Sequence, residues 1–290
     1  MTRHTQIDEG DEQMADLVLA GTAALITGGG SGIGLGAARH LLRDGASVTL
    51  AGRSQERLDA AVAELRAEAP EGAQVQGVAC DVAKEDDVVA AVEAAASLTG
   101  GLQHCVASAG TGGLGPVVAL PTEEWHRVLD INLHGAFFTL KHSGAAMVRS
   151  GGGAFVGLSS IAAPLTPPFM SAYCVSKAGL EALVRNAADE LGRSNVRVNA
   201  VRPSIVPTEL AAPLEEDPAV LADYLANMPV ARTGTVDDVA SLIRFLCGPE
   251  SSWITGQCIG IDGGHHLRRG PNVEHWARAL YGDAAIDGTG

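Results

Sequence analysis

The sequence predicts a single α/β domain with a doubly wound fold, in which a seven-stranded parallel sheet carries helices on both faces. Two observations lead to this prediction. Short apolar runs alternate with longer amphipathic runs along most of the 290 residues, and such alternation is typical of βαβ units. The chain also contains 36 glycines, which suit the tight turns between strands and helices in a fold of this class.

The apolar runs give the expected strands, and the amphipathic runs give the expected helices. Strands are expected over residues 22–27, 47–52, 75–80, 102–110, 153–160, 196–203 and 257–262. Helices are expected over residues 34–45, 54–70 and 84–98, and around 132–149 and 173–192. Because each of the first three strands is followed directly by a helix, we expect the strands to lie parallel.

Three segments fall outside this alternation. Residues 1–16 are polar and lack periodicity, which predicts a flexible N-terminal tail before a domain that spans residues 17–265. Residues 205–230 are rich in proline, alanine and acidic residues and follow the end of a strand, where open α/β sheets bind ligands, so they are a candidate lid. Residues 266–290 form a C-terminal extension, in which Trp276 either covers a substrate pocket or lies on a helix docked on the surface.

Composition and charge argue against several classes of protein. The formal net charge of −14 opposes general binding of nucleic acids, whose phosphates need a basic surface. The N-terminus lacks the apolar segment of a signal peptide, and no apolar run is long enough to span a membrane. Five widely spaced cysteines without a Cys-x-x-Cys pair suggest neither disulfides nor zinc. We therefore expect a cytoplasmic protein without a metal, with His265 and His266 at the surface or in a subunit contact.

A glycine-rich loop, LITGGGSGIG, joins the first expected strand to the first expected helix. Its glycines permit positive φ and a close approach of the backbone to a phosphate, and the helix N-terminus supplies N–H donors. Ile33 replaces the third glycine of the common Gly-x-Gly-x-x-Gly pattern, so the loop reads Thr27-Gly28-x-x-x-Gly32-x-Gly34. Taken alone, the loop is compatible with a dinucleotide site and with a tight turn that binds nothing.

The end of the second expected strand bears on the choice of cofactor. Dinucleotide sites often place an acid there to bind the ribose hydroxyls, whereas an arginine accommodates a 2′-phosphate. Gly52 occupies the expected position of the acid, and Arg53 follows it. This favours NADP(H), with NAD(H) as the alternative. A surface role for Arg53, paired with Glu56, also stays open.

Tyr173 and Lys177 lie four residues apart in SAYCVSKAG, and an expected helix would place them on one face. A nearby ammonium group favours the phenolate, so we expect Lys177 to lower the pKa of Tyr173. Ser160 stands thirteen residues before Tyr173, at the end of the fifth expected strand, where its hydroxyl can hold a substrate oxygen. Tyr173 is therefore interpreted as a proton donor, although a packed aromatic side chain is the alternative.

With these motifs, the chain resembles the short-chain dehydrogenase/reductase family, whose members are one-domain oxidoreductases of the Rossmann type. The resemblance covers roughly residues 18–264. The glycine loop matches the family's Thr-Gly-x-x-x-Gly-x-Gly sequence, and Ser160, Tyr173 and Lys177 match its catalytic serine, tyrosine and lysine. Asn132, in DINLHG, matches the family's fourth catalytic residue.

The resemblance implies a mechanism and a cofactor site. Hydride passes between the nicotinamide and a substrate carbon while Tyr173 gives or takes a proton. Lys177 holds the cofactor ribose, Ser160 orients the carbonyl, and Asn132 fixes a water that connects Lys177 to solvent. The residues expected to bind the cofactor are Thr27, Gly28, Ser31, Gly32, Ile33, Gly34, Arg53, Ser54, Asp81, Val82, Ala109, Gly110, Tyr173, Lys177, Pro203, Ile205 and Thr208.

Two positions depart from the family pattern. The family's Asn-Asn-Ala-Gly sequence after the fourth strand reads Ala107-Ser108-Ala109-Gly110, and the shorter Ser108 is expected to brace the sheet less firmly. The family's Pro-Gly pair after the sixth strand reads Pro203-Ser204, which is expected to alter the backbone path beside the nicotinamide.

The leading prediction is NADPH-dependent reduction of a ketone or aldehyde to an alcohol, or the reverse oxidation, on a small molecule. Reduction of a 3-oxoacyl thioester of CoA or of a carrier protein is an alternative. The acidic side chains within residues 205–230 would, however, repel an acidic carrier protein. A non-catalytic NADP-binding redox sensor is an alternative from another class. The resemblance also implies a homotetramer or homodimer, with the helices around 132–149 and 173–192 packed against their counterparts.

Overall fold

The computed structural model describes residues 17–268, 278, 283–287 and 289. The tail predicted over residues 1–16 lies outside the described residues, as does most of the predicted C-terminal extension, including Trp276. Within the extension, the described part contains one short helix, α12 (Asp283–Asp287).

A seven-stranded sheet with every strand parallel forms the centre of the molecule, in the order β3-β2-β1-β4-β5-β6-β7. The strands are β1 (Ala23–Thr27), β2 (Ser47–Gly52), β3 (Val75–Ala79), β4 (His104–Ala107), β5 (Gly153–Leu158), β6 (Val196–Pro203) and β7 (Cys258–Ile261). The predicted fold class and all seven predicted strands are confirmed. Because the strand order reverses between β1 and β4, the carboxyl edge of the sheet opens into a crevice at that point.

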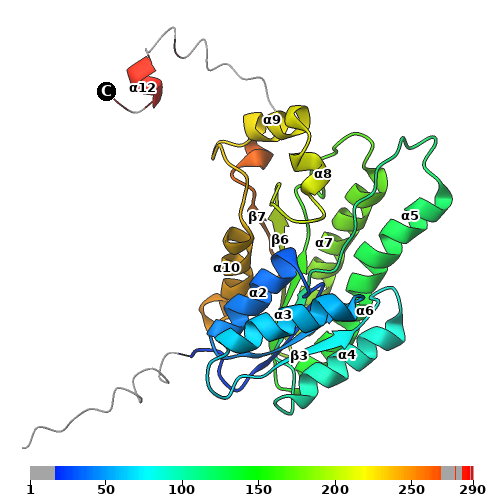
Figure 1. Ribbon diagram of the computed structural model, residues 1–290, viewed down its shortest axis with the longest axis vertical. Helices are drawn as coiled ribbons and strands as arrows, with labels where there is room; N and C mark the ends of the chain where they lie inside the picture. Colours follow the sequence, from blue (N-terminus) through cyan, green and yellow to red (C-terminus); the bar gives the residue numbers. More distant parts are fainter. Residues whose placement is uncertain (1–16, 269–277, 279–282, 288, 290) are drawn as a thin grey trace, which may run out of the picture.

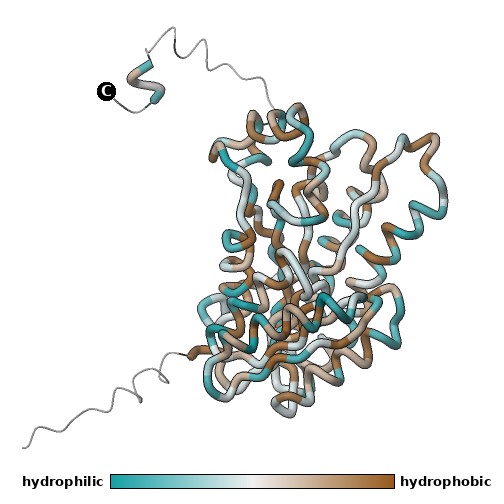
Figure 2. Tube along the Cα trace, viewed as in Figure 1, coloured by the Kyte–Doolittle hydropathy of each residue, from teal (hydrophilic) through white to brown (hydrophobic). Residues whose placement is uncertain are grey.

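Helices cover both faces of the sheet (Figure 1). One face packs against α4 (Glu85–Ser97), α6 (Gly135–Arg149) and α7 (Ser171–Gly192), and the other against α2 (Gly32–Arg43), α3 (Gln55–Glu68) and α10 (Val236–Cys247). In β1, Leu25 packs into the first apolar layer and Ile26 into the second, because alternate side chains of a strand point to opposite faces. Figure 2 shows hydrophobic residues concentrated along the strands at the centre.

Two helical regions differ from the sequence-based prediction. The helix expected to begin near residue 132 begins earlier, since α5 (Thr122–Leu129), a π-helical turn η1 (Asp130–His134) and α6 follow one another without a break. Helix α10 was not predicted, although the side chains of Thr235 and Asp238 form a capping box at its start.

Residues 205–230 lie at the carboxyl edge of the sheet and contain α8 (Ala212–Glu215) and α9 (Pro218–Asn227), which sit above the strands in Figure 1. Two 3-10 turns, η2 (Pro249–Ser251) and η3 (His265–Leu267), flank β7. Among the described residues, no helix combines the length and the apolar character needed to cross a bilayer.

Candidate active site

The larger of two adjoining cavities opens where the strand order reverses and has a volume of about 740 Å³. Its walls come from the β1–α2 turn, the ends of β2 and β3, and the segment after β4. The structure brings many of the predicted cofactor residues to this cavity: Gly28, Ser31, Gly32, Ile33, Arg53, Ser54, Asp81, Val82, Ala109, Gly110 and Thr208.

Thr27 and Gly34 of the glycine motif line neither cavity, and together with Gly28 they fix the shape of the turn. Gly28 has a φ of +68°, and a Cβ there would lie 2.8 Å from the amide nitrogen of Ala109. A Cβ on Gly34 would collide with the carbonyl oxygen of Gly28. The Thr27 hydroxyl accepts a hydrogen bond from the Ala109 amide at 3.5 Å. Thr27 and Gly34 therefore hold the turn against the segment after β4 rather than facing the cavity.

The N-terminus of α2 presents its first amide groups toward the larger cavity. Ser31 is the N-cap of this helix, but its side chain makes no capping hydrogen bond. Ser31, Gly32 and Ile33 all line the cavity. The first N–H groups of a helix lack partners within the helix and carry the positive end of its dipole, so this turn offers donors to an anionic group.

Two arginines at the end of β2 and the start of α3 add positive charge to the same cavity. Arg53 is exposed and has no ion-pair partner among the described residues, so its expected alternative pairing with Glu56 is absent there. Arg57, which the sequence analysis did not identify, donates to Glu209 at 2.5 Å. This ion pair joins α3 to the segment 205–230, a contact between positions too far apart in sequence for a local pattern to reveal.

The smaller cavity has a volume of about 180 Å³ and shares several wall residues, including Ile33 and Gly110, with the larger one. The ends of β5 and β6 and the first turns of α7 bring Ser160, Tyr173 and Lys177 together here, with Pro203 and Ile205. The predicted catalytic serine, tyrosine and lysine thus lie beside the glycine-walled cavity.

The phenol of Tyr173 differs from expectation in its acidity. Burial raises the pKa of Tyr173, and this effect outweighs the lowering caused by a side-chain hydrogen bond with Ser160. The expectation that Lys177 lowers this pKa is therefore wrong for this structure. The Lys177 ammonium lies 5.6 Å from the centre of the tyrosine ring and is engaged elsewhere, so the surrounding protein atoms dominate.

Lys177 is 4% exposed, and its Nζ donates a hydrogen bond to the carbonyl oxygen of Leu158 at 2.7 Å. Burial lowers the pKa of Lys177 to about 8, because the charged form loses hydration. A Cβ on Gly110 would lie 3.7 Å from this nitrogen. The ammonium group thus lies in the smaller cavity close to Gly110, which lines both cavities.

Asn132, in the π-helical turn η1, fixes the segment around Thr111, a residue that lines both cavities. Its side chain is buried and brackets Thr111, accepting from the Thr111 amide at 2.8 Å and donating to the Thr111 carbonyl at 2.9 Å. It also donates to the hydroxyl of Ser176 at 3.1 Å. A π-helical turn widens the helix locally and is often found at functional sites.

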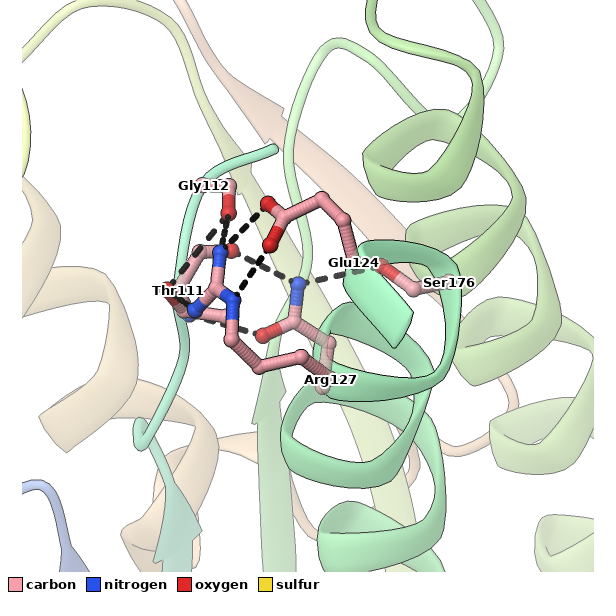
Figure 3. A network of polar contacts seen from close by, with 6 residues as sticks. Thr111, Gly112, Glu124, Arg127 and Ser176 are labelled. Carbon is pink, nitrogen blue, oxygen red and sulfur yellow. Dashed lines mark hydrogen bonds and ion pairs between the residues drawn. The ribbon is translucent and has the colours of Figure 1, made fainter. Parts of the chain in front are cut away.

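Arg127 holds the same segment from α5 and was not identified from the sequence. Its guanidinium donates to the Thr111 hydroxyl at 2.7 Å and to the Gly112 carbonyl at 2.9 Å, as Figure 3 shows. Glu124 accepts hydrogen bonds from Arg127 through both carboxylate oxygens, each at 2.7 Å. These hydrogen bonds lower the pKa of Glu124. The only local signal for this role was the Glu124–Arg127 spacing of three residues.

The structure also tests the two departures from the family pattern. The Ser108 amide donates to the Thr27 carbonyl at 3.2 Å, but no hydrogen bond of the Ser108 side chain is found among the described residues. Ser204 binds His265, with 3.0 Å between its Oγ and Nδ1 of the histidine. His265 was expected at the surface or in a subunit contact; because it is only 6% exposed, the surface alternative is wrong.

The remaining candidates are not part of a reactive cluster. His266 binds Asp262, with 2.7 Å between Nδ1 and Oδ2. The carboxylate of Asp81 accepts from the Ala83 amide at 3.2 Å. All five cysteines are unpaired. Over the described part of the chain, no three histidine, cysteine or acidic side chains are grouped so that they could hold a metal.

Comparisons with known proteins agree with this geometry. A sequence model of the family described as Enoyl-(Acyl carrier protein) reductase matches residues 28–266. Dehydrogenase/reductase SDR family member 4 from Bos taurus is 37% identical over 83% of this chain and 86% of its own length. The structure of a short-chain type dehydrogenase/reductase from Mycobacterium ulcerans matches with a TM-score of 0.84 and 41% identity, covering 93% of this chain and 98% of that chain.

A third match is a gluconate 5-dehydrogenase from Burkholderia cenocepacia J2315, whose structure is a complex with NADP and tartrate. It has a TM-score of 0.81 and 28% identity and covers 87% of this chain and 98% of that chain. Together with the parallel sheet and the adjoining cavities, these matches identify the chain as a member of the short-chain dehydrogenase/reductase family, an NAD(P)-dependent oxidoreductase that acts on alcohol or carbonyl groups.

Proposed function

We propose that this enzyme reduces a ketone or aldehyde to an alcohol with NADPH, with the cofactor in the larger cavity and the substrate in the smaller one. One observation carries the proposal: Ser160, Tyr173 and Lys177 line a small cavity that adjoins a larger, glycine-walled cavity at the reversal of strand order. A tyrosine with a neighbouring serine hydroxyl can donate a proton to a carbonyl oxygen held between them.

The larger cavity fits a dinucleotide with an additional phosphate. The turn around Gly28 has no room for a side chain, and the uncapped N-terminus of α2 offers amide donors to a pyrophosphate. Gly52 supplies no carboxylate, while Arg53, which has no ion-pair partner among the described residues, supplies positive charge for a 2′-phosphate, which favours NADP(H) over NAD(H). When bound, the nicotinamide group supplies or accepts the hydride of the reaction.

Tyr173 acts as the proton donor in this proposal. Its raised pKa keeps the phenol protonated at neutral pH, as a general acid requires. Ser160, which is hydrogen-bonded to the phenol, orients the substrate carbonyl. Lys177, whose Nζ lies 5.6 Å from the centre of the tyrosine ring, is proposed to hold the cofactor ribose.

Asn132 is proposed to act on the path of the chain rather than on the substrate. Its three hydrogen bonds to Thr111 and Ser176 use both amide N–H groups and one acceptor position of Oδ1, and Ser176 in turn donates to the Tyr173 carbonyl at 2.7 Å. This connection fixes the wall beside Lys177.

Residues 205–230 are proposed as a lid over both cavities. Thr208 and Leu210 line both, while Leu214 of α8 and Tyr224 of α9 line the smaller one. The segment carries Glu209, Glu215, Glu216 and Asp217, which disfavours an acidic carrier protein as the source of the substrate. A small ketone or aldehyde is therefore preferred to a carrier-bound thioester.

A homotetramer or homodimer is proposed from the apolar residues on the outer faces of α6 and α7. Phe137, Val148 and Val175 are each more than one-third exposed there. Exposed apolar side chains on neighbouring helices are typical of subunit interfaces. Sedimentation that gives only a monomer would contradict this assembly.

The proposed function is tested by following nicotinamide absorbance while the protein is offered NADPH or NADH with small neutral ketones, aldehydes and 3-oxoacyl-CoA esters. The expected result is turnover of ketones or aldehydes with NADPH at a higher kcat/KM than with NADH. Tight binding of NADPH without turnover of any substrate would contradict the proposal and favour a redox sensor. Turnover of the CoA esters alone would favour the thioester reductase.

A further inference from the structure

A second group of polar side chains converges on the smaller cavity, away from the residues proposed to move the proton. Ser204 follows β6, Tyr224 lies on α9, and His265 begins η3 after β7. Ser204 and Tyr224 both line the cavity, whereas His265 is buried next to them. These segments meet only in the folded chain.

His265 connects the other two residues. Its Nδ1 lies 3.0 Å from the Ser204 hydroxyl oxygen. Its ring meets the Tyr224 ring edge-on, with the ring centres 5.5 Å apart and an interplanar angle of 87°. Edge-to-face packing of this kind favours one orientation of the tyrosine. His265 therefore positions one hydroxyl by a hydrogen bond and the other by ring packing.

Tyr224 also lies close to the proposed proton donor. The two phenols are near enough for charge on Tyr224 to contribute to the raised pKa of Tyr173. Burial likewise raises the pKa of Tyr224, so its phenol stays protonated and can donate a hydrogen bond at neutral pH. A substrate that reaches Tyr173 therefore passes within reach of a second phenol.

The rest of the smaller cavity limits the charge and size of its occupant. Lys177 is the one charged side chain among the described residues that line it, and its Nζ is bound to the Leu158 carbonyl. Most other walls are apolar, such as Ile161, Met170 and Leu214. A volume of about 180 Å³ suits a small molecule. A charged substrate would find no counter-charge apart from Lys177.

We infer that Ser204 and Tyr224 bind a second oxygen of the substrate, so that the enzyme selects small uncharged carbonyl compounds bearing a further hydroxyl or carbonyl group. His265 acts as a positioning residue for this contact. The inference rests on the proposed function for the identity of the reacting carbonyl. A substrate that lacks the second oxygen leaves these buried hydroxyls without a hydrogen-bond partner. The enzyme therefore discriminates against such a substrate.

The test compares cyclohexanone with 2-, 3- and 4-hydroxycyclohexanone, using NADPH. Wild-type protein is expected to have a higher kcat/KM for at least one hydroxyketone than for cyclohexanone. Tyr224→Phe and Ser204→Ala are each expected to lower that ratio about fivefold, the size of one lost hydrogen bond. Asp223→Asn, one residue away on α9 and outside both cavities, is the matched control and keeps the wild-type ratio.

His265→Phe separates positioning from general damage, because it keeps an aromatic ring against Tyr224 but loses the bond to Ser204. KM for the preferred hydroxyketone should rise while kcat, and both constants for cyclohexanone, stay near wild type. A merely structural role would instead change the constants of both ketones together. No rescue variant is needed, because the ratio of kcat/KM for the hydroxyketone to kcat/KM for cyclohexanone is itself the readout.

Failure of the inference can be told apart from failure of the proposed function. A wild-type ratio near one for every hydroxyketone, or an unchanged ratio in both Tyr224→Phe and Ser204→Ala, overturns the inference while ketone reduction stands. If wild-type protein reduces no ketone, the proposed function fails, and calorimetric dissociation constants of the same four ketones decide the inference. Equal affinity of wild-type protein for all four would then overturn it.

Discussion

The two cavities differ in how the chain builds them. The larger cavity is made mainly of backbone and glycine around the β1–α2 turn, where a Cβ on Gly28 would lie 2.8 Å from the Ala109 amide nitrogen. The smaller cavity is made of side chains from β5, α7, the segment after β6 and α9. A site built from one local turn carries a sequence signature, whereas a site assembled from distant side chains does not.

This difference also separates the proposed tasks. The larger cavity offers amide donors and guanidinium groups, which hold an anionic cofactor. The smaller cavity offers hydroxyls and a phenol, which move a proton and select a substrate. Variants in the smaller cavity should therefore change turnover without changing cofactor affinity. Variants in the larger cavity should change cofactor affinity.

The largest expected effect comes from Ser160→Ala in the smaller cavity. Loss of the hydroxyl that orients the carbonyl should lower kcat/KM by about 10²-fold or more. Calorimetry should give an NADPH dissociation constant close to that of the wild type. The matched control is Ser159→Ala, because the neighbouring hydroxyl donates to Glu181 at 2.8 Å and is buried. Equal loss in both variants would assign the effect to local damage.

The corresponding change in the larger cavity is Gly28→Ala. The new Cβ would press on Ala109 and force a residue with a side chain to adopt a φ of +68°. NADPH should bind at least about tenfold more weakly, since backbone strain of this kind costs roughly 1–3 kcal/mol and displaces the turn. Gly72→Ala is the control: its φ is +84°, but a Cβ there meets nothing within 4 Å. Unchanged NADPH affinity in Gly28→Ala would contradict the assignment.

A smaller effect is expected from Arg53→Ala, which bears on the type of cofactor. Removing one guanidinium should weaken NADPH binding about tenfold and leave NADH binding unchanged, because only NADPH carries the 2′-phosphate. Fluorescence titration with both cofactors measures this. Arg43→Ala, which breaks a pair with Glu68 at 3.0 Å outside both cavities, should affect neither cofactor. An equal loss for NADH would show that Arg53 does not select the phosphate.

The smallest effect on either cavity is expected from His104, at the opposite end of β4. It is 6% exposed, and neither ring nitrogen has a hydrogen-bond partner within the described structure. Burial lowers its pKa from 6.5 to about 4. Below pH 6.5 the unfolded chain therefore takes up a proton on His104 that the folded protein does not. The free energy of unfolding is therefore unaffected by this group above pH 6.5 and declines as the pH falls toward 4.

His104→Leu should remove this decline, which amounts to on the order of 3 kcal/mol for a shift of this size. Chemical denaturation at pH 7 and pH 4 measures the free energy of unfolding of both proteins. Turnover and NADPH affinity at pH 7 should match the wild type, since the residue lines neither cavity. An equal decline in both proteins would show that other groups cause the acid sensitivity.

The sequence predicted the fold and the larger cavity well because their signals are local. Every strand was predicted from its own apolar run, and the motif from Thr27 to Gly34 lies in one turn. The Arg57–Glu209 pair and the contact of Tyr224 with His265 join segments far apart in sequence, so no local pattern indicated them. The pKa of Tyr173 was predicted in the wrong direction because spacing gives the neighbour, whereas burial depends on the whole fold.

The most direct test of this division measures NADPH affinity and ketone reduction on the same preparation of Tyr173→Phe. Our account predicts an NADPH dissociation constant within about twofold of wild type and reduction slowed by at least about 10²-fold, since only the proton donor is lost. Reduction at the wild-type rate would contradict Tyr173 as the proton donor. Loss of NADPH binding in parallel with turnover would contradict the separation of the two cavities.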